Sequence, residues 1–183
     1  MPDEALPRFP YHPDPLGTGS VAQSAAACRC CGRARGYIYT GPAYARDDLD
    51  DALCPWCIAD GSASKRFDAE FTDAAGIGGY GRWPTVSPEV IEEVSRRTPG
   101  FMGWQQEQWW TCCDDAGEFL GRGGYAELSQ RWSGAIPEIR KESGIEDAGW
   151  EPYLRALDRD DAPTAYVFRC RHCGRLGGYS DTP

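Results

Sequence analysis

Histidine is scarce in this sequence, and its scarcity limits the metal chemistry that the chain can support. Only His12 and His172 occur among 183 residues. Catalytic zinc sites are commonly built on two or three histidines, with one coordination position left open for water. A catalytic metal centre rich in histidine is therefore excluded, and any metal ligands must come from other side chains.

Long apolar runs are also missing. No stretch of about 18 consecutive apolar residues occurs, so the sequence predicts no transmembrane helix. The first residues, Met1-Pro2-Asp3-Glu4, carry neither the positive charge nor the apolar segment of a secretory signal. We therefore expect a cytoplasmic protein with no membrane partner, in a compartment that keeps thiols reduced.

Positive charge is in deficit. Lysine and arginine number 19 against 28 aspartates and glutamates, which gives a formal net charge of -9. Binding of nucleic acid relies on basic side chains at the phosphates, so free nucleic acid is an unfavourable partner. A basic protein is the partner that this charge favours. We expect an acidic face, although the same residues can simply be a solvated surface: Asp47, Asp48, Asp50, Asp51, Asp158, Asp160 and Asp161.

Cysteine, by contrast, is plentiful, with nine residues that are mostly arranged in close pairs. In a reducing compartment, C-x-x-C spacing favours a metal site over disulfides, because two cysteines on one tight turn can direct both sulfurs at one ion. The pairs Cys28/Cys31 and Cys54/Cys57 therefore predict one four-cysteine Zn²⁺ site.

Two alternatives remain open at this first site. Cys54-Pro55-Trp56-Cys57 resembles a redox-active dithiol, but the second C-x-x-C nearby and the lack of an apolar strand before it favour metal binding. Cys30 lies between Cys28 and Cys31, so spacing alone also allows it to replace one of the expected ligands.

The remaining cysteines predict a second zinc site in the C-terminal half, formed by Cys112, Cys113, Cys170 and Cys173. A contiguous pair is an unusual source of two ligands. If only one of them binds, then Asp114, Asp115, His172 or water could complete the site, and an open position would make the ion potentially catalytic.

Local patterns predict a mixture of short strands and helices. Residues 1–27 are rich in proline and predict an extended arm, and the glycine clusters at 76–81 and 121–124 predict loops. Strands are expected at 37–42 and 166–170. Helical structure is expected at 47–53, at 62–71, from Pro88 to before Pro99 with Ser87 as N-cap, and along a stripe from Trp150 to Leu157.

These elements predict an α+β fold that resembles a zinc ribbon, with short β-hairpins, several helices and two cysteine-rich metal sites. We expect one domain over residues 1–183, with an N-terminal zinc-binding half at about 1–75 and a C-terminal half at about 76–183 that holds the second site. The aromatic and amide-rich segment 103–110 leads into Cys112 and can either line a pocket or pack in the core.

Several ordered motifs resemble the CbrC family of bacterial proteins. They are Tyr11-His12-Pro13-Asp14-Pro15, Tyr37-Ile38-Tyr39-Thr40-Gly41-Pro42, the stretch from Cys54 to Ser62, and Phe67-Asp68-Ala69-Glu70-Phe71. The resemblance runs from about Leu6 to Tyr179. It implies a bacterial cytoplasmic protein linked to tolerance of stress or of a DNA-cleaving colicin. The family pattern often has a His-Cys pair where Cys112-Cys113 stands, and its aspartate two positions later is matched by Asp115.

Two functions are compatible with these observations. The first is a zinc-stabilised binding protein, without catalytic residues, that meets a basic partner such as a cationic nuclease toxin. The alternative is a metal-dependent hydrolase acting on phosphoesters, with an open metal site. Its candidate ligands and acid-base groups are His12, Asp14, Asp60, Asp68, Glu70 and Asp73. An enzyme requires these groups to converge, whereas a binding protein requires two closed cysteine sites.

Overall fold

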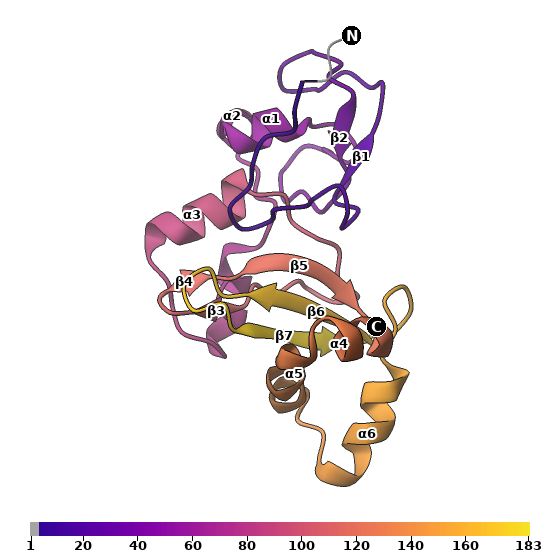
Figure 1. Cartoon of the computed structure of the whole chain (residues 1–183). Coiled ribbons are helices and arrows are strands. Elements are labelled where there is room, and N and C mark those ends of the chain that lie inside the picture. Colours follow the sequence, from indigo (N-terminus) through magenta and orange to yellow (C-terminus); the bar gives the residue numbers. More distant parts are fainter. Residues whose placement is uncertain (1–3) are drawn as a thin grey trace.

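A three-stranded antiparallel sheet occupies the middle of the molecule (Figure 1). The computed structural model describes residues 4–183. The sheet has the order β5-β6-β7, with β5 at Glu118–Gly123, β6 at Thr164–Arg169 and β7 at Leu176–Asp181. The observed β6 confirms the strand that the sequence predicts at 166–170.

The central strand β6 is buried on both faces, which explains its apolar composition. Because side chains alternate along a strand, Tyr166 and Phe168 face one side while Ala165 and Val167 face the other. The first pair belongs to an aromatic core with Trp109. The second pair belongs to a separate core under the C-terminal helices. The sheet therefore separates two apolar layers.

The N-terminal part lies beyond one side of this sheet and contains short elements (Figure 1). Strand β1 at Val21–Gln23 pairs antiparallel with β2 at Tyr37–Tyr39, and helices α1 at Pro55–Ala59 and α2 at Ser62–Phe67 follow. The predicted strand at 37–42 and the helix from Ser62 are confirmed, although both are shorter than expected. The arm contains one strand that the sequence pattern does not indicate.

Two local predictions are wrong. Residues 47–53 are irregular instead of helical, with a turn at residues 50–51 where Asp51 has a positive φ of 49°. The cluster at 121–124 is not a loop, because Gly121 and Gly123 lie within β5. Gly121 lies where the β5-β6 register shifts, and its unusual backbone angles allow the strand to form a β-bulge there.

Helix α3 at Pro88–Arg97 begins where the sequence predicts. The Ser87 hydroxyl accepts a hydrogen bond from the Val90 N–H, and Pro88 occupies the first helical turn. Two short 3-10 turns, η1 at Ala74–Gly76 and η2 at Gly79–Gly81, occupy the glycine-rich segment before it. After α3 come the two-residue strands β3 at Thr111–Cys112 and β4 at Asp115–Ala116.

Three helices and a 3-10 turn form the region on the far side of the sheet. They are α4 at Tyr125–Gln130, η3 at Ser133–Ala135, α5 at Ile136–Ser143 and α6 at Asp147–Ala156. The predicted stripe in the last helix is confirmed, with Trp150, Leu154 and Leu157 buried. The α+β fold class is thus confirmed, while the division into halves near residue 75 stays a prediction.

In the described residues, no helix combines the length and the apolar character needed to cross a membrane.

Candidate metal centres

The first group, here called the N-terminal cluster, consists of Cys28, Cys31, Cys54 and Cys57. Their sulfur atoms all lie within 4.8 Å of one another. The Sγ–Sγ separations are 3.8 Å for Cys28/Cys57, 3.9 Å for Cys31/Cys54 and 3.6 Å for Cys54/Cys57. A disulfide would require about 2.05 Å. A tetrahedral zinc with bonds of about 2.3 Å requires sulfurs about 3.8 Å apart, and the observed distances fit that geometry.

Backbone hydrogen bonds shape the first knuckle of this cluster. The Gly32 N–H donates to the Cys28 carbonyl at 2.7 Å, and the Cys28 N–H donates to the Arg33 carbonyl at 2.8 Å. Gly32 has a φ of 72°, a left-handed conformation that glycine adopts without steric cost. The other pair lies at the start of α1, where Cys54 is the N-cap and Pro55 opens the helix. A helical turn therefore directs Cys54 and Cys57 at the knuckle.

The second group, the C-terminal cluster, consists of Cys112, Cys113, Cys170 and Cys173. These sulfurs also lie within 4.8 Å of one another. The Cys112 Sγ is 3.7 Å from that of Cys113 and 3.9 Å from that of Cys173. The same tetrahedral separation of about 3.8 Å is matched here. The structure thus brings together every cysteine that the sequence assigns to the two sites.

A tight turn explains how contiguous cysteines can face one point. Cys112 pairs with Asp115 across the β3-β4 hairpin, which leaves Cys113 and Asp114 as its two-residue loop. Both loop residues have positive φ values, 54° and 58°, as a type I′ turn requires. The turn therefore brings the Cys113 side chain back toward Cys112.

The knuckle after β6 has the same two backbone hydrogen bonds as the knuckle at Cys28 and Cys31. The Gly174 N–H donates to the Cys170 carbonyl at 3.0 Å, and the Cys170 N–H donates to the Arg175 carbonyl at 2.8 Å. Gly174 has a φ of 72°. The shared sequence is Cys-Arg-x-Cys-Gly-Arg, with Cys30 in one knuckle and His172 in the other at the variable position. One local structure therefore supplies half of each cluster.

The first cysteine of each knuckle has a lowered pKa. Burial raises the pKa of Cys28, but hydrogen bonds from backbone N–H groups outweigh that effect and lower it to about 7. The same balance lowers the pKa of Cys170 to about 6. Burial raises the pKa of Cys54 to about 11, and it raises the pKa values of Cys57 and Cys112 as well. A bound cation would favour deprotonation of all the thiols of a cluster.

Asp115 belongs to a network beside the C-terminal cluster and not to the sulfur group itself. Its carboxylate accepts hydrogen bonds of 2.8 Å from the Tyr11 hydroxyl, from Arg171 and from the His172 Nε2. Burial raises the pKa of Asp115, but the hydrogen bonds from Tyr11 and His172 outweigh it, so the net pKa is lowered. The sequence pattern placed Asp115 and His172 near the predicted metal site but did not indicate Tyr11.

The alternative ligands have other partners in this structure. His172 is half-exposed and binds Asp115, and the Cys30 sulfur lies 3.6 Å from the Ser62 hydroxyl. The arginine that follows the first cysteine of each knuckle pairs with a carboxylate, Arg29 with Asp47 and Arg171 with Asp115. Four sulfurs are therefore the atoms of each cluster that could hold a metal ion.

His12, the first hydrolase candidate, is fully buried and has both ring nitrogens engaged. Its Nδ1 lies 2.7 Å from the Pro99 carbonyl, and its Nε2 lies 2.6 Å from the Thr18 hydroxyl. Because a carbonyl can only accept, Nδ1 carries the proton and Nε2 accepts from Thr18. The ring packs edge-on against Phe119 at 5.2 Å. These contacts give His12 a structural role.

The candidate carboxylates are dispersed over separate turns. Three of them accept a nearby backbone N–H, from Gly17, Ser62 and Ala75 respectively: Asp14, Asp60 and Asp73. Asp68 and Glu70 both pair with Arg96. In the described part of the chain, at least three potential metal ligands come close together at two places, which are the two cysteine clusters. The hydrolase constellation is therefore not assembled.

The structure also locates the aromatic segment 103–110 and the two acidic runs. The end of the segment 103–110 packs into the aromatic core, with Trp109 and Trp110 fully buried, whereas residues 104–106 are exposed. The acidic runs do not form one face, because residues 47–51 lead into α1 while residues 158–161 join α6 to β6 (Figure 1).

Comparison with known proteins identifies close relatives along nearly the whole chain. The sequence profile of the uncharacterised protein family UPF0167 matches residues 6–182. UPF0167 proteins of Mycobacterium bovis and Mycobacterium tuberculosis are each 46% identical over 186 residues, covering 97% of this chain and 94% of the relative. A UPF0167 protein of Pseudomonas aeruginosa is 42% identical over 171 residues, covering 93% of each chain. No solved structure matches this chain significantly.

Proposed function

The chain belongs to the uncharacterised protein family UPF0167, and from that premise we propose that it is a zinc-stabilised binding protein of the CbrC type. In this proposal both cysteine clusters hold Zn²⁺ as a structural ion. The protein acts in the reducing environment of the bacterial cytoplasm, where free thiolates persist. Its task is to bind a partner, and the resemblance to the CbrC family suggests tolerance of a toxin as the setting.

One observation carries the proposal, namely that each cluster offers four sulfurs at tetrahedral spacing. Four thiolates saturate zinc and leave no position for water, which is the arrangement of structural sites. Thiolates also suit iron, so the metal's identity needs a direct measurement. Structural zinc contributes about 10–16 kcal/mol of apparent binding free energy in small peptides, which exceeds or matches the stability of a typical domain of about 5–15 kcal/mol.

The partner is inferred from charge. A net charge of -9 attracts basic surfaces over several ångströms and accelerates their association. The run at Asp47, Asp48, Asp50 and Asp51 is exposed and lies next to the N-terminal cluster in the sequence, so a metal-fixed turn would hold it in place. We therefore propose a basic protein as partner, with a cationic nuclease domain as the first candidate.

Zinc quantification on purified variants tests the structural part. The wild-type chain is expected to carry two zinc ions, and Cys57→Ser and Cys173→Ser one each. Cys30→Ser is the matched control, because it removes a thiol from the first knuckle without removing a sulfur from the cluster, and it is expected to keep two ions. If Cys173→Ser retained both ions, the C-terminal site would be refuted.

Calorimetric titration with a colicin-type DNase domain tests the partner. Binding is expected at low salt, to weaken as salt rises, and to be lost when the four aspartates at 47, 48, 50 and 51 are changed to asparagine. The asparagines keep the local turn because they retain an acceptor oxygen. Failure of the zinc-loaded wild-type protein to bind at about micromolar concentration would overturn this partner and leave the zinc assignment standing.

A further inference from the structure

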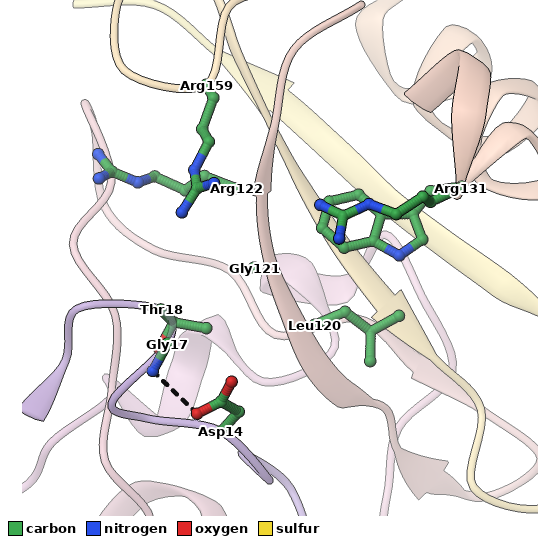
Figure 2. Close-up of a pocket in the computed structure, with 9 residues that line it drawn as sticks. Asp14, Gly17, Thr18, Leu120, Gly121, Arg122, Arg131 and Arg159 are labelled. Atoms are coloured by element: carbon green, nitrogen blue, oxygen red, sulfur yellow. Dashed lines mark hydrogen bonds between the residues drawn. The ribbon is translucent and has the colours of Figure 1, made fainter. Parts of the chain in front are cut away.

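A polar cavity of about 180 Å³ lies at the edge of the central sheet, away from both cysteine clusters. Its walls come from the turn at residues 14–18, from β5, from the end of α4 and from the loop after α6 (Figure 2). The residues that decide its chemistry are Asp14, Thr18, Gly121, Arg122, Arg131 and Arg159. No cysteine lines it.

Three arginines on one cavity are unexpected in a chain of net charge -9. Within residues 4–183, neither Arg131 nor Arg159 has a carboxylate oxygen within 4.0 Å of its guanidinium nitrogens. Arg122 lies 3.9 Å from Asp160, whose side chain is 79% exposed. Among the residues that line the cavity, three arginines and the carboxylate of Asp14 give two net positive charges, and Asp160 lies outside this lining.

The fold keeps this cavity open. Gly121 has a φ of 134° at the β-bulge, and a Cβ there would lie 3.7 Å from Thr18 and from Trp132. Any larger side chain at this position would therefore fill the floor of the cavity. The Thr18 hydroxyl is held by His12, and the Arg131 guanidinium lies over the Trp132 ring at 5.0 Å. Thr18 is thus fixed by a residue outside the cavity, and Arg131 is fixed by a neighbouring residue of the lining.

We propose that this cavity binds the phosphate group of a small phosphate monoester. Guanidinium groups match phosphate oxygens with paired hydrogen bonds, and two net positive charges balance a dianion. The volume lies below the range of about 300–1,000 Å³ typical of sites for larger ligands, so a compact molecule is the fitting occupant. Figure 2 shows Asp14 bonded to the Gly17 N–H, with Arg122 and Arg159 on one side of β5 and Arg131 on the other, and the second oxygen of Asp14 can accept a ligand hydroxyl.

Isothermal titration with inorganic phosphate and with glycerol phosphate tests this site on the zinc-loaded full chain, at about pH 8, where both are dianions. Saturable binding is expected for both, tighter for glycerol phosphate because its hydroxyl can reach Asp14. Arg131→Gln and Arg159→Gln are each expected to weaken binding by about tenfold, since each removes a charge-assisted contact.

Arg46→Gln is the matched control, because Arg46 is exposed and does not line the cavity, so affinity should be unchanged. An unchanged melting temperature in the unliganded variants separates loss of binding from unfolding. The proposal is overturned if neither ligand binds at about millimolar concentration, or if Arg46→Gln weakens binding as much as the cavity variants. Tighter binding of a single-stranded oligonucleotide than of glycerol phosphate would overturn the small-molecule assignment.

Discussion

At the scale of single residues, the candidate functional side chains are of two kinds. The cysteines lie together in two clusters, whereas other candidates, such as His12, are buried and hydrogen-bonded within the fold. The sequence predicted the cysteine clusters well, because C-x-x-C spacing restricts where two sulfurs can lie. It could not show that His12 is buried, since its two partners, Pro99 and Thr18, come from different parts of the chain. Nor could it show that Cys113 has a left-handed backbone, which allows the contiguous pair to act together.

The burial of His12 predicts a specific pH dependence of stability. Burial lowers its pKa from 6.5 to about 4 in the folded protein. Between these values the unfolded chain binds more protons than the folded one, so stability is complete above about pH 6.5 and falls as the pH drops toward 4. A shift of this size corresponds to a loss of about 3 kcal/mol.

Urea unfolding at several pH values, compared between the wild type and His12→Gln, measures this contribution. Subtracting the two curves cancels the effect of cysteine protonation and of other carboxylates. The difference in unfolding free energy between the two proteins should shrink as the pH falls from 7 to 4, by roughly the amount that the pKa shift implies. A difference that stays constant with pH would show that His12 is not buried in its neutral form.

At the scale of elements, prediction succeeded where the local signal agreed with the tertiary environment. The Ser87-Pro88 start of α3 and the apolar stripe of α6 were recognised because capping and periodicity are local properties. The strand at Gly121–Gly123 was missed because glycines normally indicate loops, whereas here β6 pairs with them across a bulge. Helices α4 and α5 lack a long apolar stripe and take their stability from packing on the sheet.

The cap of α3 provides a prediction at this scale. Ser87→Ala removes the hydroxyl that accepts the Val90 N–H, and should destabilise the protein by about 1 kcal/mol. Ser87→Asp retains an acceptor at the helix start and should restore the loss. Thermal unfolding of the three proteins measures the effect. Equal melting temperatures for wild type and Ser87→Ala would mean that the cap contributes nothing.

At the scale of the whole molecule, the two cysteine clusters lie in different parts of the fold and connect different elements. The N-terminal cluster lies in the core that also contains Tyr39, Leu53 and Ile58. The C-terminal cluster connects the β3-β4 hairpin to the turn between β6 and β7. The arginine-lined cavity emerges only at this scale, because Arg122, Arg131 and Arg159 belong to separate segments and no spacing rule relates them.

Exposure of the sulfurs predicts the order in which the clusters lose metal. Cys113 and Cys173 are exposed in the C-terminal cluster, whereas Cys31 is the exposed member of the N-terminal one. A chelator should therefore remove the C-terminal ion first, in a biphasic release followed with a zinc-sensitive dye. Cys173→Ser should lack the fast phase and Cys57→Ser the slow phase. Release in one phase from the wild type would contradict the difference between the clusters.

The central claim, that each cluster is a closed four-sulfur metal site, is tested most directly by X-ray absorption at the metal edge of the purified protein. The account predicts zinc with an average of four sulfur neighbours at about 2.3 Å and no nitrogen or oxygen in the first shell. An average clearly below four sulfurs, or cysteines found as disulfides without metal, would contradict it.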